Sequence, residues 1–101
     1  MDKNLKNKNV IVTGGLGGIG YSIVKKFYEE GSNVGIFDIS KKKIKNRTVK
    51  NKNSIKLFNC DLTDKDEVQS SVDAFLEDFG SIDILINNAG VLYSEPLIGL
   101  K

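Results

Sequence analysis

The chain has 101 residues, of which 40% are hydrophobic and 28% are charged, and its formal net charge is +2. This length predicts a single domain over residues 1–101 with a modest core, and it excludes two domains. The small net charge indicates no polyanionic partner, the one cysteine excludes an internal disulfide, and without histidine neither a Ser-His-Asp triad nor a metal site is expected.

The N-terminal part of the chain contains no pattern typical of a targeting segment. Residues 1–9 are polar and rich in lysine, and the apolar run after them is too short for a secretory signal or a membrane span. A lone cysteine, Cys60, is typical of a reducing compartment, where it would be a buried small residue. We therefore expect a cytoplasmic protein without a membrane partner.

The first predicted elements are a strand and a helix joined by glycines. Val10–Val12 is an apolar run that predicts a buried strand. Apolar residues at helical spacing follow from Gly18, and Gly31 predicts the end of that helix. The connection between them reads Thr13-Gly14-Gly15-Leu16-Gly17-Gly18-Ile19-Gly20.

This glycine turn predicts a binding site for the pyrophosphate of a dinucleotide. Glycines allow the tight turn and let the backbone approach the phosphates, while the helix N-terminus supplies N–H donors and the positive end of a dipole. A plain tight connection is the alternative, because glycine-rich turns also occur without a ligand. The strand before the turn and the helix after it favour the pyrophosphate site.

The second predicted strand, Val34–Phe37, is followed by an acid, Asp38. Asp38 comes 18 residues after Gly20, where a carboxylate can accept hydrogen bonds from the adenosine ribose and repel a 2'-phosphate. The alternative is a solvated aspartate at a strand end. The pattern favours NAD over NADP, although Lys41–Lys43 are close enough in sequence to meet a 2'-phosphate if they do not simply form a solvated face.

The connector over residues 40–53 is basic. It carries seven lysines and arginines and no acid between residues 41 and 52, and we expect it to hold a short or frayed helix. It lacks the interleaved aromatic residues and the module patterns of nucleic-acid-binding proteins, so no nucleic-acid partner is predicted.

The second half of the chain continues the alternation of strands and helices. Ile55–Phe58 predicts a third strand, and a helix is expected from Asp64 to an end at Gly80. Ile82–Ile86 predicts a fourth strand of the kind that is covered on both faces. This alternation predicts an α/β fold of the Rossmann type, a doubly wound parallel sheet with four strands in the order 3-2-1-4.

Three motifs in order and spacing resemble those of the short-chain dehydrogenases/reductases. They are Thr13-Gly14-x-x-x-Gly18-Ile19-Gly20, Asp61-Leu62-Thr63-Asp64 and Asn87-Asn88-Ala89-Gly90. The resemblance covers about residues 6–90. Gly15 and Gly17 would also fit the glycine pattern of the family's extended branch, but the Asn-Asn-Ala-Gly motif favours the standard branch.

The resemblance implies a cofactor site made by residues from all three motifs. Backbone groups of the glycine turn would line the pyrophosphate, Asp38 would hold the ribose, and Thr13 and Asn87 would be structural. The Asp61 carboxylate and the Leu62 N–H would meet the adenine edge, and the last motif would pass beneath the ribose nearer the nicotinamide. The implied contact residues are Gly14, Leu16, Gly17, Gly18, Ile19, Asp38, Asp61, Leu62, Asn88, Ala89 and Gly90.

The resemblance also implies an NAD(P)-dependent oxidoreductase that transfers a hydride between nicotinamide and an alcohol or ketone, with NAD as the expected cofactor and a homo-oligomeric full-length form. The family's catalytic serine and Tyr-x-x-x-Lys pair follow the last motif, where this chain offers only residues 91–101. Tyr21 and Lys25 have the spacing of that pair but lie on the first helix. No catalytic residue is assigned, and we expect the 101 residues alone to be inactive.

Two interpretations of the chain therefore stay open, besides a remote third in which the basic stretch over residues 41–52 binds a nucleic acid. The favoured one is the N-terminal cofactor-binding part of a short-chain oxidoreductase, with a sheet that is incomplete on its C-terminal side. The alternative is a noncatalytic dinucleotide-binding or interaction module that a partner completes.

The incomplete sheet predicts marginal stability for the 101 residues alone. The fourth strand would leave one edge and one face exposed, which favours association. Thermal unfolding followed by circular dichroism should give a low, broad transition. A cooperative, monomeric transition at high temperature would contradict this expectation.

Overall fold

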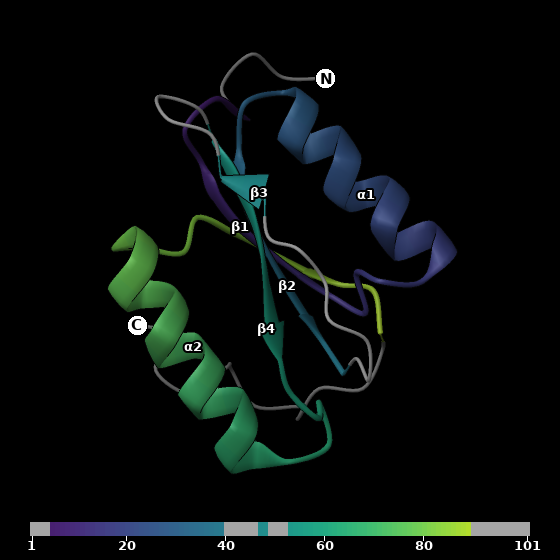
Figure 1. The fold of residues 1–101 in the computed structure, drawn as a ribbon, viewed down its shortest axis with the longest axis vertical. Coiled ribbons are helices and arrows are strands. Elements are labelled where there is room, and N and C mark those ends of the chain that lie inside the picture. The colour runs from purple at the N-terminus through teal and green to yellow at the C-terminus, as the bar shows by residue number, and fades with distance from the viewer. Residues whose placement is uncertain (1–4, 40–46, 49–52, 90–101) are drawn as a thin grey trace.

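A computed structural model describes residues 5–39, 47–48 and 53–89 of the chain (Figure 1). Two helices and five strands alternate along it. They are β1 (Asn9–Thr13), α1 (Gly18–Glu29), β2 (Asn33–Asp38), β3 (Arg47–Thr48), β4 (Ser54–Asn59), α2 (Lys65–Phe79) and β5 (Ile84–Asn87).

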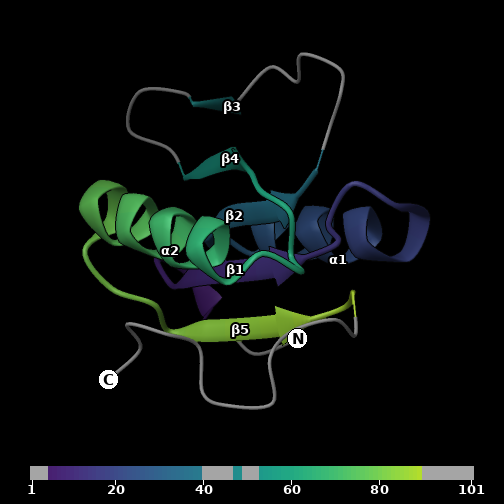
Figure 2. The same cartoon turned by 90° about the horizontal axis from the view of Figure 1, so that it is seen from below.

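The strands form one sheet in the order β3-β4-β2-β1-β5, as Figure 2 shows from one end of the molecule to the other. β1 runs parallel to both β2 and β5, and β2 runs parallel to β4. With the short β3 set aside, the four parallel strands have the predicted order 3-2-1-4. The prediction of a Rossmann-type sheet is confirmed.

β3 is the one strand that the sequence did not predict. Arg47 and Thr48 pair antiparallel with Ile55 and Ser54, at the edge of β4 that would otherwise expose its backbone groups. The predicted helix in the connector is therefore wrong for residues 47–48, because the edge of a sheet offers hydrogen-bond partners that a helix with few apolar anchors cannot match. Residues 40–46 and 49–52 of that prediction lie outside the described residues.

The two helices cover opposite faces of the sheet (Figure 1). Val24 and Phe27 of α1 pack on one face against a cluster that includes Val10, Val12 and Ile36. On the other face α2 covers side chains that alternate with these along the same strands. That second cluster consists of Ile11, Phe37, Phe58, Cys60, Val68, Val72 and Phe75.

Both predicted helix boundaries at the ends of α2 are found. The Asp64 carboxylate accepts hydrogen bonds from the N–H groups of Asp66 and Glu67, which makes it the N-cap. Gly80, with φ of 88°, ends the helix and donates its N–H to the Leu76 carbonyl. The helix therefore starts and stops where local sequence signals placed it.

β5 begins two residues later than the predicted strand and lies at one end of the described sheet. Its apolar residues, Ile84, Leu85 and Ile86, are half-buried, whereas every residue of β1 is buried. The expectation that both faces are covered does not hold in the described part of the chain, because β5 has only β1 beside it there. Among the described residues no strand pairs with the outer edge of β5, as expected.

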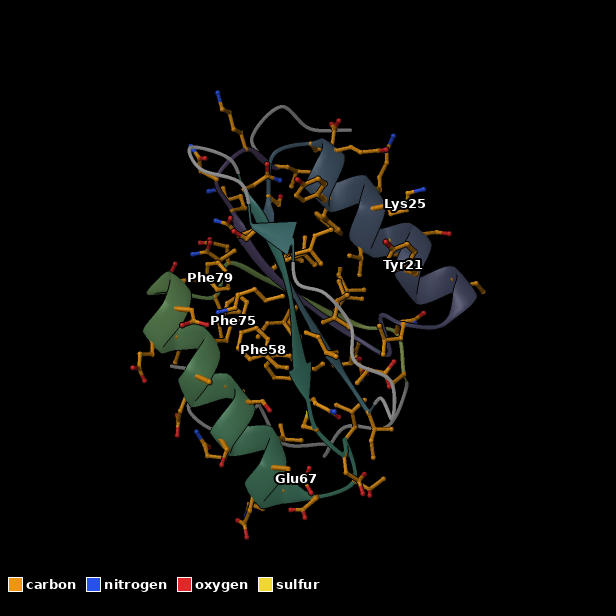
Figure 3. The ribbon with its side chains drawn as sticks, in the orientation of Figure 1. Tyr21, Lys25, Phe58, Glu67, Phe75 and Phe79 are labelled. Carbon is orange, nitrogen blue, oxygen red and sulfur yellow. The ribbon has the colours of Figure 1, made fainter. Side chains whose placement is uncertain are left out.

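Aromatic side chains beneath α2 pack closely against β2. Phe58, Phe75 and Phe79 gather between α2 and the sheet (Figure 3), and a Cβ added at Gly35 would lie 2.6 Å from the Phe75 ring. Gly35→Ala should lower the free energy of unfolding by about 1–3 kcal/mol, because the ring must shift.

Gly18→Ala is the matched control for this change. A Cβ at Gly18 would meet nothing within 4 Å, and alanine suits a helix better than glycine. Urea unfolding of both variants checks the prediction. Equal free energies of unfolding for Gly35→Ala and Gly18→Ala would contradict the prediction, because they would show that the Phe75 ring can shift without cost.

Candidate functional site

The predicted site residues lie at one edge of the sheet, where parallel strands have their carboxyl ends. Thr13, Asp38 and Asn87 are the last residues of β1, β2 and β5. β1 has β2 on one side and β5 on the other, and the helices that follow β1 and β4 cover opposite faces. Such a switch in direction opens a crevice outside the carboxyl ends of the strands, which is where doubly wound folds bind ligands.

The glycine turn after β1 requires glycine at two positions for different reasons. Gly14 has φ of +67°, a left-handed conformation that other residues rarely adopt, and its N–H donates to the Phe37 carbonyl at 2.9 Å. A Cβ at Gly20 would overlap the Gly14 carbonyl oxygen and come within 2.7 Å of the Asn88 amide nitrogen. The close approach of α1 to the turn therefore depends on the missing side chain of Gly20.

The N-terminus of α1 suits an anion. Its N-cap, Gly17, makes no side-chain hydrogen bond, and no acid lies in the first turn. Gly17 and Gly18 are exposed, and a Cβ at Gly18 would meet nothing within 4 Å. The first-turn N–H groups thus have no side-chain cap, and together with the positive end of the helix dipole they suit a phosphate.

α2 differs in each of these respects. Asp64 caps its first turn, and Asp66 and Glu67 add negative charge there. Of the two described helices, α1 is therefore the one whose N-terminus offers its donors to an external anion.

Asp38 is fixed against the glycine turn. Its Oδ2 accepts the Leu16 N–H at 3.1 Å, and its Oδ1 accepts the Ile39 N–H at 2.8 Å. The Leu16 N–H, predicted to line the pyrophosphate, is thus directed at Asp38 in this structure. Each carboxylate oxygen still has acceptor capacity for a hydroxyl donor.

Thr13, buried in the sheet, joins the ends of β1 and β5. Its hydroxyl donates to Asn87 Oδ1 at 3.0 Å and accepts the Ala89 N–H at 3.2 Å. Asn88 donates its side-chain amide to the Gly14 carbonyl at 3.2 Å. The glycine turn and the start of the third motif are therefore one connected unit, while Gly90 lies outside the described residues.

Asp61 and Leu62 follow β4 at the same edge of the sheet. The Cys60 N–H donates to the Asp38 carbonyl at 2.9 Å, which places Asp61 beside the end of β2. Asp61 Oδ1 accepts the hydroxyl and the N–H of Thr63, and these hydrogen bonds hold the pKa of Asp61 below its usual value. Asp61 is therefore ionised at neutral pH, as a hydrogen-bond acceptor should be.

The sequence did not predict two features of this edge. Ile39, directly after Asp38, is 62% exposed, and Ile19 in the glycine turn is 77% exposed, although large apolar side chains are usually covered. Glu67 Oε1 accepts the Asp61 N–H at 3.0 Å. An Asp-x-Thr sequence is a signal for the turn at Asp61, but no sequence signal pairs Asp61 with a residue on α2.

Other candidate groups contribute little to the site. Cys60 is buried, and burial raises its thiol pKa although a hydrogen bond with Ser71 lowers it, so the thiol stays protonated at neutral pH. Tyr21 and Lys25 both project from the exposed side of α1 (Figure 3). Within residues 5–39, 47–48 and 53–89, no three acids or cysteines gather to hold a metal ion. Neither described helix is long and apolar enough to cross a membrane.

Comparison with known proteins gives a match along almost the whole chain. Residues 8–100 match the family model described as short chain dehydrogenase. The chain is 36% identical to short-chain dehydrogenase reductase 3b of Arabidopsis thaliana, over 97% of this chain and 38% of that protein. It is 38% identical to a 3-oxoacyl-(acyl-carrier-protein) reductase of Chlamydia muridarum, over 100% of this chain and 42% of that one.

Solved structures agree with this match. Ligand-free aldohexose dehydrogenase of Thermoplasma acidophilum is 32% identical with a TM-score of 0.72, over 98% of this chain and 36% of that chain. NADH-dependent reductase A1-R' complexed with NAD is 28% identical with a TM-score of 0.70, over 86% and 38% of the two chains. The chain thus spans about two fifths of the length of the proteins it matches.

The Thr13 hydroxyl should stabilise the connection between β1 and β5. Thr13→Val keeps the shape but leaves the Ala89 N–H and Asn87 Oδ1 without this partner, so unfolding should become easier by about 1–3 kcal/mol. In Thr13→Ser the hydroxyl is kept. Amide hydrogen exchange should show that the Ala89 N–H loses protection in the valine variant and keeps it in the serine variant. Equal protection in both would contradict the prediction.

Proposed function

Because the chain belongs to the short-chain dehydrogenase family, whose members are NAD(P)-dependent oxidoreductases, we propose that it supplies the cofactor-binding part of such an enzyme. The reaction would be hydride transfer between the nicotinamide and an alcohol or ketone. The observation that carries the proposal is the uncapped N-terminus of α1 beside Asp38, built on the glycine turn.

The pyrophosphate would bind at the start of α1. Backbone N–H groups of Gly17, Gly18 and Ile19 belong to the part of the turn that lacks a side-chain cap and an acid. A phosphate there gains charge-assisted hydrogen bonds and the helix dipole, without displacing a carboxylate. The Leu16 N–H would take part only indirectly, because it holds Asp38.

Asp38 would bind the adenosine ribose and select NAD. Two backbone N–H groups fix its carboxylate, so its remaining acceptor capacity suits the two ribose hydroxyls. A 2'-phosphate would instead bring a second negative charge to this carboxylate, and repulsion between like charges at hydrogen-bond distance is strong near a protein surface. NAD is therefore the proposed cofactor.

The nicotinamide end would lie toward Asn88 and Ala89. Asn88 donates a hydrogen bond to the Gly14 carbonyl, and the Ala89 N–H donates one to the Thr13 hydroxyl. These two hydrogen bonds keep the residues that follow β5 at a fixed distance from the glycine turn. When bound, the nicotinamide supplies the hydride chemistry. The residues described here bind and orient the cofactor, and no catalytic role is assigned to them.

The proposed substrate class is no narrower than alcohols and ketones. Among the proteins this chain resembles are a 3-oxoacyl-(acyl-carrier-protein) reductase, an aldohexose dehydrogenase and a (+)-borneol dehydrogenase of Salvia officinalis. These names cover acyl, sugar and terpene substrates. All three are named as dehydrogenases or reductases. This supports the proposal that the chain is part of an oxidoreductase over the alternative of a noncatalytic dinucleotide-binding module.

Calorimetric titration with NAD and NADP tests the cofactor proposal. The protein should bind NAD at least about tenfold more tightly than NADP, and Asp38→Asn should weaken NAD binding and remove most of the preference, because it removes the charge that repels a 2'-phosphate. Glu77→Gln is the matched control, since Glu77 is an exposed carboxylate on α2. Tighter binding of NADP by the unmodified protein would overturn the NAD preference.

A further inference from the structure

The carboxylate of Asp61 is held by one oxygen only. Thr63 donates its hydroxyl to Asp61 Oδ1 at 2.7 Å and its N–H to the same atom at 2.9 Å. Oδ2 of Asp61 accepts no hydrogen bond from the residues that the structure describes. The two oxygens of this carboxylate are therefore different, and Oδ2 is the one available to a ligand.

The backbone around Asp61 is fixed as well. The Asp61 N–H donates to Glu67 Oε1 at 3.0 Å, and the Asp61 carbonyl accepts the Asp64 N–H at 3.0 Å. Asp64 in turn caps α2 (Figure 3 shows Glu67 at that end of the helix). The turn that carries Asp61 is thus anchored to the first turn of a helix, and the Asp61 side chain has little freedom left to rotate.

We propose that Thr63 is a positioning residue that turns Asp61 Oδ2 toward the base of the cofactor, so that the site selects adenine over hypoxanthine. The inference rests on the proposed function and on the contact with the adenine edge that the resemblance to the family implies for Asp61. Adenine presents a 6-amino donor, whereas hypoxanthine presents a 6-oxo acceptor. A carboxylate oxygen can only accept, so it pairs with the first base and repels the second.

The fixed Oδ1 leads to a specific consequence for Asp61→Asn. Both Thr63 donors require an acceptor at the Oδ1 position, so the carbonyl oxygen of the new amide must occupy it. The amide nitrogen then takes the place of Oδ2 and presents a donor to the base. The base preference should therefore reverse, and this reversal should depend on Thr63.

Calorimetric titration with NAD and with nicotinamide hypoxanthine dinucleotide tests the proposal. The unmodified protein should prefer NAD by about tenfold or more, and Thr63→Val should reduce that ratio by about three- to tenfold. Thr63→Ser, which keeps the hydroxyl, should retain it. Asp61→Asn should bind the hypoxanthine dinucleotide better than NAD, and adding Thr63→Val to it should weaken this reversal, because only the backbone N–H of residue 63 then fixes the amide.

A readout without any dinucleotide separates orientation from binding. In a carbon-detected NMR titration of the Asp61 carboxyl, Thr63→Val should raise its pKa toward the usual value, and Thr63→Ser should leave the pKa low. Thermal melting checks that the exposed Thr63 variants are folded.

The outcomes distinguish this inference from the proposed function. If the unmodified protein binds neither dinucleotide, both are overturned. If it binds NAD but Thr63→Val leaves the ratio of the two affinities unchanged, or Asp61→Asn still prefers NAD, the positioning role of Thr63 is wrong and the proposed function stands.

Discussion

The Thr13 hydroxyl sits where three parts of the molecule meet, and the geometry of the site depends on it. It connects the end of the buried β1 to Asn87 at the end of β5 and to the Ala89 N–H beyond it. Asn88 then reaches back to the Gly14 carbonyl, which leaves no room for a side chain at Gly20. These contacts fix the distance between the glycine turn and the end of β5. A ligand bound across this edge of the sheet therefore contacts a surface of fixed geometry.

The charge distribution follows from how each helix begins. α2 starts with an aspartate cap and two further acids, so its dipole is neutralised by its own residues. α1 starts with glycines, and the Asp38 carboxylate accepts the Leu16 N–H of the glycine turn before this helix. Positive potential at α1 and negative charge at Asp38 therefore lie side by side, which matches a phosphate followed by a ribose with free hydroxyls.

Local sequence signals were enough for much of the fold and for the motifs. Glycines after a strand, Asp64 before a helix and Gly80 after it act through neighbouring residues, so the boundaries of α2 followed from sequence. The antiparallel pairing of β3 and the contacts of Asp38 with Leu16 and of Asp61 with Glu67 join elements whose relative positions arise only on folding. Sequence patterns identified the acids of the site but not the backbone groups that orient them.

If the start of α1 binds the pyrophosphate of a dinucleotide, its backbone amides must respond to NAD. Proton–nitrogen correlation spectra of the labelled protein with increasing NAD report each backbone amide separately. The amide signals of Gly17, Gly18 and Ile19 should shift most, while those of Asn33 and Ser54, at the opposite ends of the strands, should stay in place. NAD binding that leaves the three turn amides unshifted would contradict this placement of the pyrophosphate.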